Sequence, residues 1–302
     1  WEGDALPDDM LQPPDDPTFT RSSVAYKQDG TQVSTDVPRF EDGKFGKAVM
    51  VEEGTTNVAG SDNSFEAGLN GFSVYNSTGT LEQSSEQAFN GIYSLKFTRN
   101  SYATLSGVMK SISGASSYAG KTVTLSWKVK GVGSAIGKTI CANIYDNVTG
   151  STSGPTITLD GTWQTITVTK TISSSATAVN IYWLSSTLAV GDIVYADCVQ
   201  LEEKPYATSF IDGTRSPETL TIPTAGVLNP QEGTIEFWWC PINQPASTMT
   251  GSQTVAPPII QVGNYYQNNS WLLWCGISSQ LELLVRGDNA TGWTGRRLVE
   301  LD

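Results

Sequence analysis

The sequence predicts an all-β protein built from two antiparallel β-sandwiches. Its 302 residues exceed what one hydrophobic core usually organises, so we expect more than one domain. Short β-branched runs alternate with Gly, Asn and Ser turn signals, a pattern typical of antiparallel sandwiches. No stretch shows the 3.6-residue apolar period of a long amphipathic helix, so strands and turns should account for the fold.

The first 39 residues predict an extended acidic N-terminal arm and leader. Residues 1–18 contain six acids and no base, and such a segment has too little apolar surface to form a core. Further on, the dipeptide Asp29-Gly30 between AYK and TQV predicts a hairpin turn. The stretch FGKAVMVEE at 45–53 reads as a strand, with Val49 and Val51 on one face.

Residues 58–205 hold enough strand candidates for one complete sandwich. The candidates are SFEAGLNGFSVYN, GIYSLKFTR, TVTLSWKVKG, TICANIYD, TWQTITVTKTI, AVNIYWLSS and DIVYADCVQLEE. Alternation along these strands places Trp127 and Trp183 on the core face. Strands follow again after residue 206, in LTIP, TIEFW, IIQV, SWLLWC, LELLV and RRLVE. We expect this last part to be incomplete at residue 302, because a sandwich needs more strands.

Composition excludes several classes of function. The formal charge is −12 and there is no histidine. An acidic surface repels phosphates, so no nucleic acid partner is expected, and no apolar run is long enough for membrane insertion. Without histidine the chain has no Ser-His or Cys-His nucleophile and no His-ligated metal. The four cysteines form no CxxC pair and are expected as reduced, mostly buried thiols: Cys141, Cys198, Cys240 and Cys275.

Four motifs in the middle of the chain resemble the carbohydrate-binding modules of families 4 and 9. They are Asn63-Ser64-Phe65-Glu66-Ala67-Gly68, then Gly91-Ile92-Tyr93-Ser94-Leu95-Lys96, the strand TVTLSWKVKG, and Asp197-Cys198-Val199-Gln200-Leu201-Glu202. Phe72 stands where the family usually has Trp. The resemblance covers most of residues 58–203 and implies a carbohydrate-binding β-sandwich.

The flanking segments resemble a laminin-G-like, concanavalin-A-like jelly roll. The matching stretches are Gly43-Lys44-Phe45-Gly46-Lys47-Ala48, Leu220-Thr221-Ile222-Pro223 and Gly233-Thr234-Ile235-Glu236-Phe237-Trp238. In that family the two halves adjoin, so residues 40–57 plus 206–302 should form one discontinuous jelly roll with 58–205 inserted in it. Residues 45–53 should then pair with strands from 206–302, and the module's ends near Asn57 and Tyr206 should lie close together.

The combination resembles bacteriophage tail, tail-fibre and tailspike proteins. The resemblance rests on the leader stretches FTRSS, PRF and VEEGTTN and on the exit stretch QLEEKPYATSFI. It implies a non-enzymatic structural and receptor-binding component of the virion that binds cell-surface polysaccharide, forms a homotrimer and contacts other tail proteins. Two alternatives stay open: the carbohydrate-binding region of a secreted bacterial glycoside hydrolase, and a bacterial surface adhesin. No catalytic residue is assigned, because chance carboxylate pairs are common in a chain with 30 acids.

Two candidate sites follow. The resemblance to the modules implies a structural calcium held by Glu66, Asp197 and a backbone carbonyl near Asn90, since calcium takes six or more oxygen ligands. The alternative is an ordinary surface turn. Alternation also places a set of polar and aromatic residues on outward faces, where rings stack on sugar C–H groups and polar groups bond hydroxyls. This set is Lys128, Asn143, Tyr145, Asn180 and Tyr182, and the alternative for it is an inert sheet surface.

Overall fold

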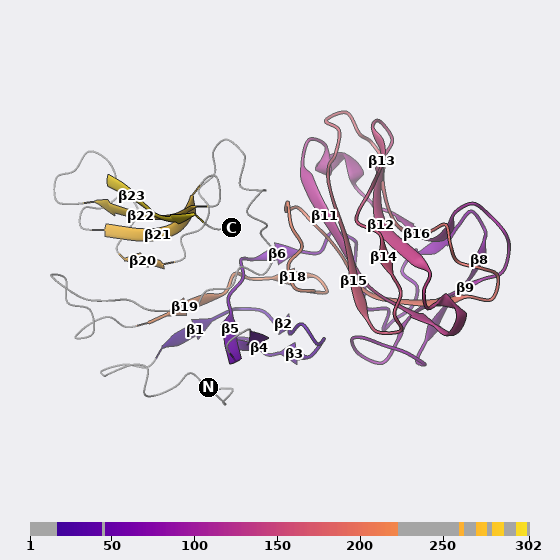
Figure 1. The fold of residues 1–302 in the computed structure, drawn as a ribbon, viewed down its shortest axis with the longest axis horizontal. Helices are drawn as coiled ribbons and strands as arrows, with labels where there is room; N and C mark the ends of the chain where they lie inside the picture. Colours follow the sequence, from indigo (N-terminus) through magenta and orange to yellow (C-terminus); the bar gives the residue numbers. More distant parts are fainter. Residues whose placement is uncertain are drawn as a thin grey trace. The chain divides into compact units, whose positions relative to one another are not determined.

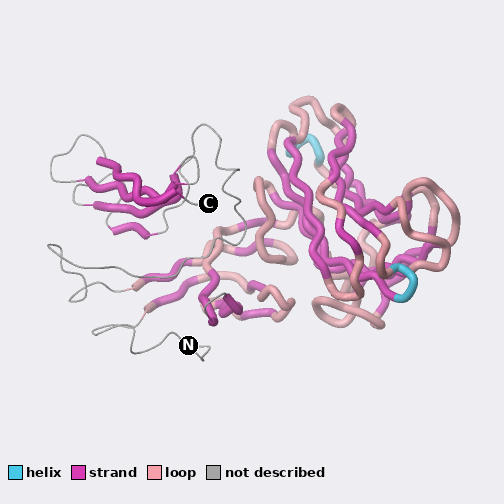
Figure 2. The backbone as a smooth tube through the Cα atoms, viewed as in Figure 1, coloured by secondary structure: helices cyan, strands magenta, loops and turns pink. Residues whose placement is uncertain are grey.

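A computed structural model describes residues 17–43 and 46–222, together with the strands β20 (Ile260–Val262), β21 (Ser270–Gly276), β22 (Gln280–Arg286) and β23 (Thr294–Glu300). The chain divides into two compact units, Trp1–Trp238 and Trp239–Asp302. Apart from two 3₁₀ turns, η1 (Ala115–Tyr118) and η2 (Gly133–Ala135), the described elements are strands (Figure 2). Within these ranges no helix has the length and apolar character to span a bilayer. The predicted all-β, antiparallel fold is confirmed.

Two antiparallel sheets form the sandwich of the first unit (Figure 1). One sheet has the order β13-β12-β16-β10-β7, with β14 beside β12, and the other has the order β15-β11-β17-β9-β8. The first sheet's strands are β7 (Ser73–Tyr75), β10 (Ser106–Ser111), β12 (Thr139–Asp146), β13 (Gly150–Ser153), β14 (Ile157–Thr158) and β16 (Val179–Ser185). The second sheet's strands are β8 (Gly79–Ser84), β9 (Ser94–Arg99), β11 (Thr122–Val132), β15 (Gln164–Thr171) and β17 (Ile193–Glu202).

The core lies between these sheets and is built on the residues that alternation places inward. Trp127 of β11 and Trp183 of β16 are fully buried, as predicted. Phe72 meets Trp127 edge-on with ring centroids 5.3 Å apart, and Phe97 meets Trp183 at 5.1 Å. Edge-to-face ring pairs of this kind stabilise the fold beyond what the burial of their apolar surface contributes. The seven strand candidates of 58–205 are all present as strands, whereas β8, β10, β13 and β14 were not predicted.

Residues 17–57 and 206–222, here called the connector, flank the sandwich and pair with each other. Two short sheets join its halves, and two hairpins lie within its first half. The joining pairs are β1 (Thr18–Thr20) with β19 (Thr219–Thr221), and β6 (Thr55–Thr56) with β18 (Thr214–Arg215). The hairpins are β2 (Ala25–Tyr26) with β3 (Gln32–Val33), and β4 (Arg39–Gly43) with β5 (Gly46–Met50). The hairpin predicted at Asp29-Gly30 is confirmed, and Gly30 has the positive φ of 88° that its turn requires.

The predicted pairing of residues 45–53 with strands from 206–302 stays a prediction. Within 206–222 the described residues show one backbone–backbone hydrogen bond to this stretch, from the Glu218 N–H to the Glu52 carbonyl at 2.9 Å. β5 pairs with β4, with Val49 opposite Phe40, whereas Leu220 lies opposite Phe19 of β1. Pairing with β4 closes a short loop. This costs less conformational entropy than closing the long loop that a strand pair across the inserted module requires. The C-terminal strands pair among themselves in the order β20-β21-β22-β23. The assignment of 40–57 plus 206–302 to one jelly roll stays a prediction, and the arm at residues 1–16 lies outside the described residues.

The two ends of the sandwich lie side by side, as an insertion at one turn requires. The backbone N–H of Val58 donates to the carbonyl of Leu201 at 2.7 Å. Beside it, the Thr55 hydroxyl donates to the Glu202 carboxylate at 2.7 Å. The Lys204 ammonium lies 2.8 Å from the Glu53 carboxylate. The chain therefore leaves and re-enters the connector at the same place, which was the expectation for the ends near Asn57 and Tyr206.

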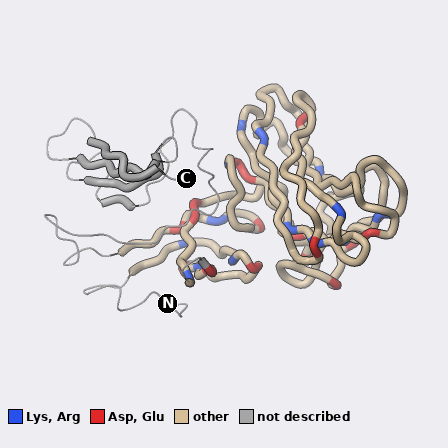
Figure 3. Tube along the Cα trace, in the orientation of Figure 1, with Lys and Arg blue, Asp and Glu red and all other residues tan. Residues whose placement is uncertain are grey.

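A buried ion-pair network holds the connector together. Three arginines, each no more than 1% exposed, converge on two glutamates: Arg21, Arg39 and Arg215 on Glu52 and Glu218. Figure 3 shows the basic and acidic residues of the connector next to each other. The arginines of FTRSS and PRF and the first glutamate of VEEGTTN, which the resemblance to tail proteins singled out, thus belong to one contact network.

Candidate glycan-binding face

The outer face of the sheet β13-β12-β16-β10-β7 carries a cluster of tyrosines. Strand register sets the cluster: Asn180 lies opposite Tyr145, and Tyr182 lies opposite Asn143 on one side and Met109 on the other. Because Val108, Ile144 and Ile181 alternate with these residues and are fully buried, the tyrosines point away from the core. Tyr75 joins them from β7, and we call Tyr75, Tyr145, Tyr182 and Asn180 the tyrosine face.

Two of these tyrosines are in direct ring contact. Tyr75 and Tyr182 meet edge-on, with ring centroids 5.5 Å apart and planes at 88°. Burial raises the pKa of the Tyr182 phenol, and the neighbouring phenols of Tyr75 and Tyr145 raise it further. The Tyr182 hydroxyl therefore stays protonated at neutral pH and can both donate and accept hydrogen bonds. Tyr182 is only 7% exposed, so Tyr75, Tyr145 and Asn180, each partly exposed, offer most of the accessible surface.

The structure brings four of the five predicted glycan-binding residues onto one sheet face. Asn143 is among them, but it is 3% exposed and its amide is already engaged. Its Nδ2 donates to the Cys141 carbonyl at 3.2 Å, and its Oδ1 accepts from the Ser153 hydroxyl at 2.5 Å. Asn143 therefore positions neighbouring groups and has no free amide for a ligand.

Lys128 does not belong to this face. It lies on β11 in the other sheet, opposite Asp197, and its ammonium sits 4.4 Å from the centroid of the Phe89 ring. Alternation correctly places Lys128 outside the core, yet it says nothing about which of the two sheets a strand joins. Tyr75 was not among the predicted residues. Its neighbour Val74 pairs with the buried Val108, so alternation along this strand places Tyr75 on the outer face.

The two carboxylates predicted to bind calcium both face the loop 89–93. Backbone N–H groups donate to Glu66 from Ile92 and Tyr93 at 2.9–3.1 Å, and to Asp197 from Phe89 and Asn90 at 2.8 and 3.0 Å. These N–H groups direct their partly positive hydrogen atoms at the carboxylates, and they would repel a cation bound at the same oxygens. The residues with described side chains include no group of three or more His, Cys, Asp or Glu able to hold a metal. The calcium site stays a prediction.

Asp197 is buried where the strand β17 is irregular. Its Oδ1 accepts from the Cys198 N–H at 2.7 Å, and Cys198 has the positive φ of 48°. Burial raises the pKa of Asp197 to about 7, although its N–H donors lower it. Cys198 and Cys141 are free thiols, with Cys198 buried and Cys141 partly exposed, whereas Cys240 and Cys275 lie outside the described side chains.

Comparisons with known proteins find similarity at the level of structure. No protein-family profile matches the sequence, and no curated protein matches it. The C-terminal family 22 carbohydrate-binding module of Clostridium thermocellum Xyn10B is 17% identical, covering 49% of this chain and 97% of its own, with a TM-score of 0.40. The family 22 xylan-binding module of Paenibacillus barcinonensis Xyn10C is 15% identical over 52% and 99%, with a TM-score of 0.38. A family 4 module is 19% identical over 48% and 99%, with a TM-score of 0.34. At these values none of the likenesses assigns a ligand to this chain.

Proposed function

We propose that this chain is a non-enzymatic structural and receptor-binding component of a bacteriophage tail, a tailspike or tail fibre, that binds host cell-surface glycan through the tyrosine face. The observation that carries the proposal is the cluster of Tyr75, Tyr145 and Tyr182 beside Asn180 on one sheet face. Phenol rings offer apolar surface to sugar C–H groups, and the hydroxyls and the amide bond sugar hydroxyls.

A single shallow site of this kind binds a sugar weakly. A Kd near 1 mM corresponds to about −4 kcal/mol, which is too weak for attachment by one copy. Several copies on one particle raise the effective affinity without new contacts. The proposal therefore includes a homotrimer, other tail proteins as partners, and a place in the virion at the host surface.

The tail assignment is inferred from the resemblance of the leader and exit stretches to tail proteins. The leader and exit stretches that resemble tail proteins are more than 140 residues apart, yet Arg39 and Glu52 share a contact network with Glu218 and Ser209. The resemblance therefore rests on one structural unit.

Within the sandwich, Asp197 is the carboxylate whose surroundings raise its pKa, and it is not placed to act as a glycosidase acid. A glycosidase needs an acid with a raised pKa that can reach the scissile bond. Asp197 has the raised pKa, but it is completely buried and hydrogen-bonded to backbone N–H groups. It therefore cannot contact a polysaccharide from this position.

Retention on host cell-wall polysaccharide tests the glycan face. We expect the variant Tyr145→Ala/Tyr182→Ala to lose retention, while Tyr102→Ala, which alters a side chain 88% exposed on a loop outside the face, keeps it. Because Tyr182 is mostly buried, the single variant Tyr145→Ala separates lost binding from lost folding. Equal retention by the wild type and both Tyr145 variants would rule out the face. Tail and lysis genes beside this gene would separate the tail assignment from a secreted glycoside hydrolase or an adhesin.

A further inference from the structure

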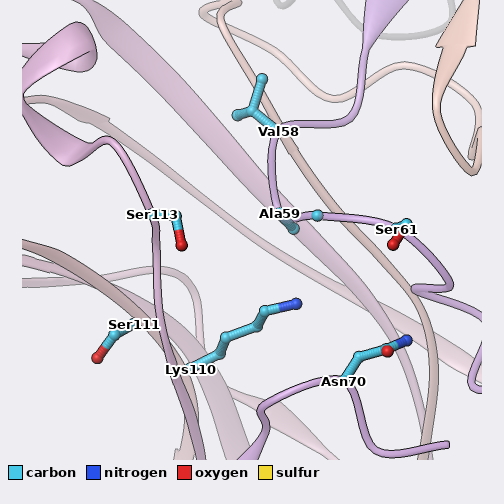
Figure 4. A pocket seen from close by; sticks show the side chains of 8 residues that line it. Val58, Ala59, Ser61, Asn70, Lys110, Ser111 and Ser113 are labelled. Carbon is cyan, nitrogen blue, oxygen red and sulfur yellow. The ribbon is translucent and has the colours of Figure 1, made fainter.

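A small polar cavity opens at the end of the sandwich where the chain enters it. Its volume is about 230 Å³, below the range of about 300–1,000 Å³ that accommodates drug-sized ligands. The segment Val58–Ser61, the tip of β10 and the following loop line it, and Figure 4 shows the Lys110 side chain extending between them. The polar lining residues are Ser61, Asn70, Lys110, Ser111 and Ser113.

The Lys110 ammonium in this cavity has no direct counter-ion. Among the described residues, no carboxylate or carbonyl oxygen lies within hydrogen-bonding distance of its Nζ. Its neighbour is the ring of Phe72, whose centroid lies 4.7 Å away. Burial lowers the pKa of Lys110, which reflects the cost of holding this charge away from water. An ammonium has three N–H donors, and here all three are free for a ligand.

Two aspartates near Lys110 are already engaged with N–H donors. Asp62 accepts from the backbone of Glu66 and Ala67 at 2.7 and 2.8 Å and from the amide of Asn70 at 2.8 Å. Asp212 accepts from the backbone of Asp62 and Asn63, both at 3.1 Å. Their charges act on Lys110 from a distance and partly offset its attraction for an anion, so binding should be weak.

We propose that this Lys110 pocket binds a single anionic group, a sugar carboxylate or a phosphate. The ammonium supplies the charge, and the hydroxyls of Ser61 and Ser113 supply neutral donors near it. The small volume admits one such group and excludes a chain of sugars. The apolar face of Phe72 below the ammonium keeps the cation in place through a cation–π contact.

The pocket and the tyrosine face meet at Ser111, because Lys110 pairs with the buried Ile181 and lies on the core side of β10. Ser111 lies opposite Asn180, and Asn180 lies opposite Tyr145, so one row of residues runs from the pocket rim to the tyrosines. Neighbouring strands are about 4.8 Å apart, which places the Ser111 and Tyr145 backbones about 10 Å apart. That the anion belongs to an acidic glycan rests on the proposed function, whereas the anion site itself does not.

Titration of the full chain with sodium glucuronate, inorganic phosphate and neutral glucose, followed by backbone amide NMR shifts, tests the pocket. We expect glucuronate or phosphate to shift the amides of Ser61 and Ser113 at millimolar concentration, and glucose to leave them unshifted. Lys110→Met should weaken the acid's binding at least tenfold, and Lys110→Arg should retain part of it. The matched control is Lys121→Met, which removes an exposed lysine paired with Glu203.

The outcomes separate the two sources of the anion. Shifts with glucuronate alone indicate an acidic sugar, and shifts with phosphate alone indicate a phosphorylated glycan. Unchanged acid binding in a folded Lys110→Met, or no shift of the pocket amides in the wild type, would overturn the proposal. The Tyr145→Ala/Tyr182→Ala variant should still bind the small acid, so failure of the tyrosine face leaves this result intact.

Discussion

Replacing Glu218 with Gln should destabilise the connector more than any surface substitution. The Glu218 carboxylate accepts from Arg21 Nη1 at 2.8 Å, from Arg39 Nε and Nη2 at 2.9 and 2.6 Å, and from the Glu52 N–H at 2.8 Å. All four donors converge on a side chain that is itself fully buried. Glutamine has the same shape, but it replaces one acceptor oxygen with an NH₂ group that faces other donors.

The size of the effect follows from the two arginines that remain. Removing one partner of a buried ion pair costs about 3–5 kcal/mol, because the other charge is left buried. Arg39 keeps the Glu52 carboxylate at 2.7 Å, and Arg21 keeps only backbone carbonyls such as that of Val37 at 3.0 Å. With an m-value of about 2–3 kcal/mol/M in urea, the transition midpoint should fall by roughly 1–2 M.

Urea denaturation with a matched control measures this effect. The control is Glu203→Gln, which breaks the exposed Lys121–Glu203 pair at 2.8 Å and should cost less than about 1 kcal/mol. Because a chain with two units need not unfold in one step, the transition should be followed by limited proteolysis within the connector as well as by fluorescence. Equal midpoints for the two variants would refute the claim that the network stabilises the connector.

Three further predictions concern the loop 89–93. Gly91→Ala should destabilise the sandwich more than Gly137→Ala, as thermal melting would show: both have positive φ, but only at Gly91 would a Cβ meet Glu66, 2.3 Å from its Oε1. The pKa of Asp197 is raised to about 7 in the folded protein, against about 3.9 in the unfolded chain, so the folded state holds this proton more tightly. The stability that this proton contributes is fully present below pH 4 and is lost as pH rises to 7. Urea unfolding should therefore show a stability decline of up to roughly 4 kcal/mol that Asp197→Asn removes, and an equal slope in both proteins would contradict this. Finally, the N–H donors to Glu66 predict that Glu66→Ala lowers the melting temperature whereas EDTA does not, and a drop with EDTA would support the calcium site.

Alternation of apolar and polar residues predicted the strands of the sandwich well, because each strand shows this pattern within its own few residues. The β12 and β16 strands place Ile144 and Ile181 inward and Tyr145 and Tyr182 outward, as the sequence indicates. A strand with few apolar residues gives no such signal, so β10, with the sequence SGVMKS, was missed. Lys110 was missed with it, and so was the pocket that this residue lines.

Which strands pair, and which sheet they join, could not be obtained from alternation. Lys128 and Tyr145 have the same outward parity and lie in different sheets. The strand at 46–50 has an apolar period that suits many partners, and its pairing with β4 closes a far shorter loop than a pairing across the sandwich would. The ion-pair network depends on residues up to 197 positions apart, such as Arg21 and Glu218, and no local rule connects them.

The buried network has a consequence for how the sandwich, with its proposed glycan-binding face, is presented. Buried ion pairs often add little net stability over apolar packing, but they penalise any arrangement that leaves a charge unpaired. Here Glu52 precedes the sandwich, Arg215 and Glu218 follow it, and all three must meet for the charges to be paired. The sandwich is therefore held at both ends instead of hanging on one flexible linker. Multivalent binding gains most when the geometry allows several sites to engage one surface together, and a sandwich tied at both ends limits the orientations that each copy can adopt.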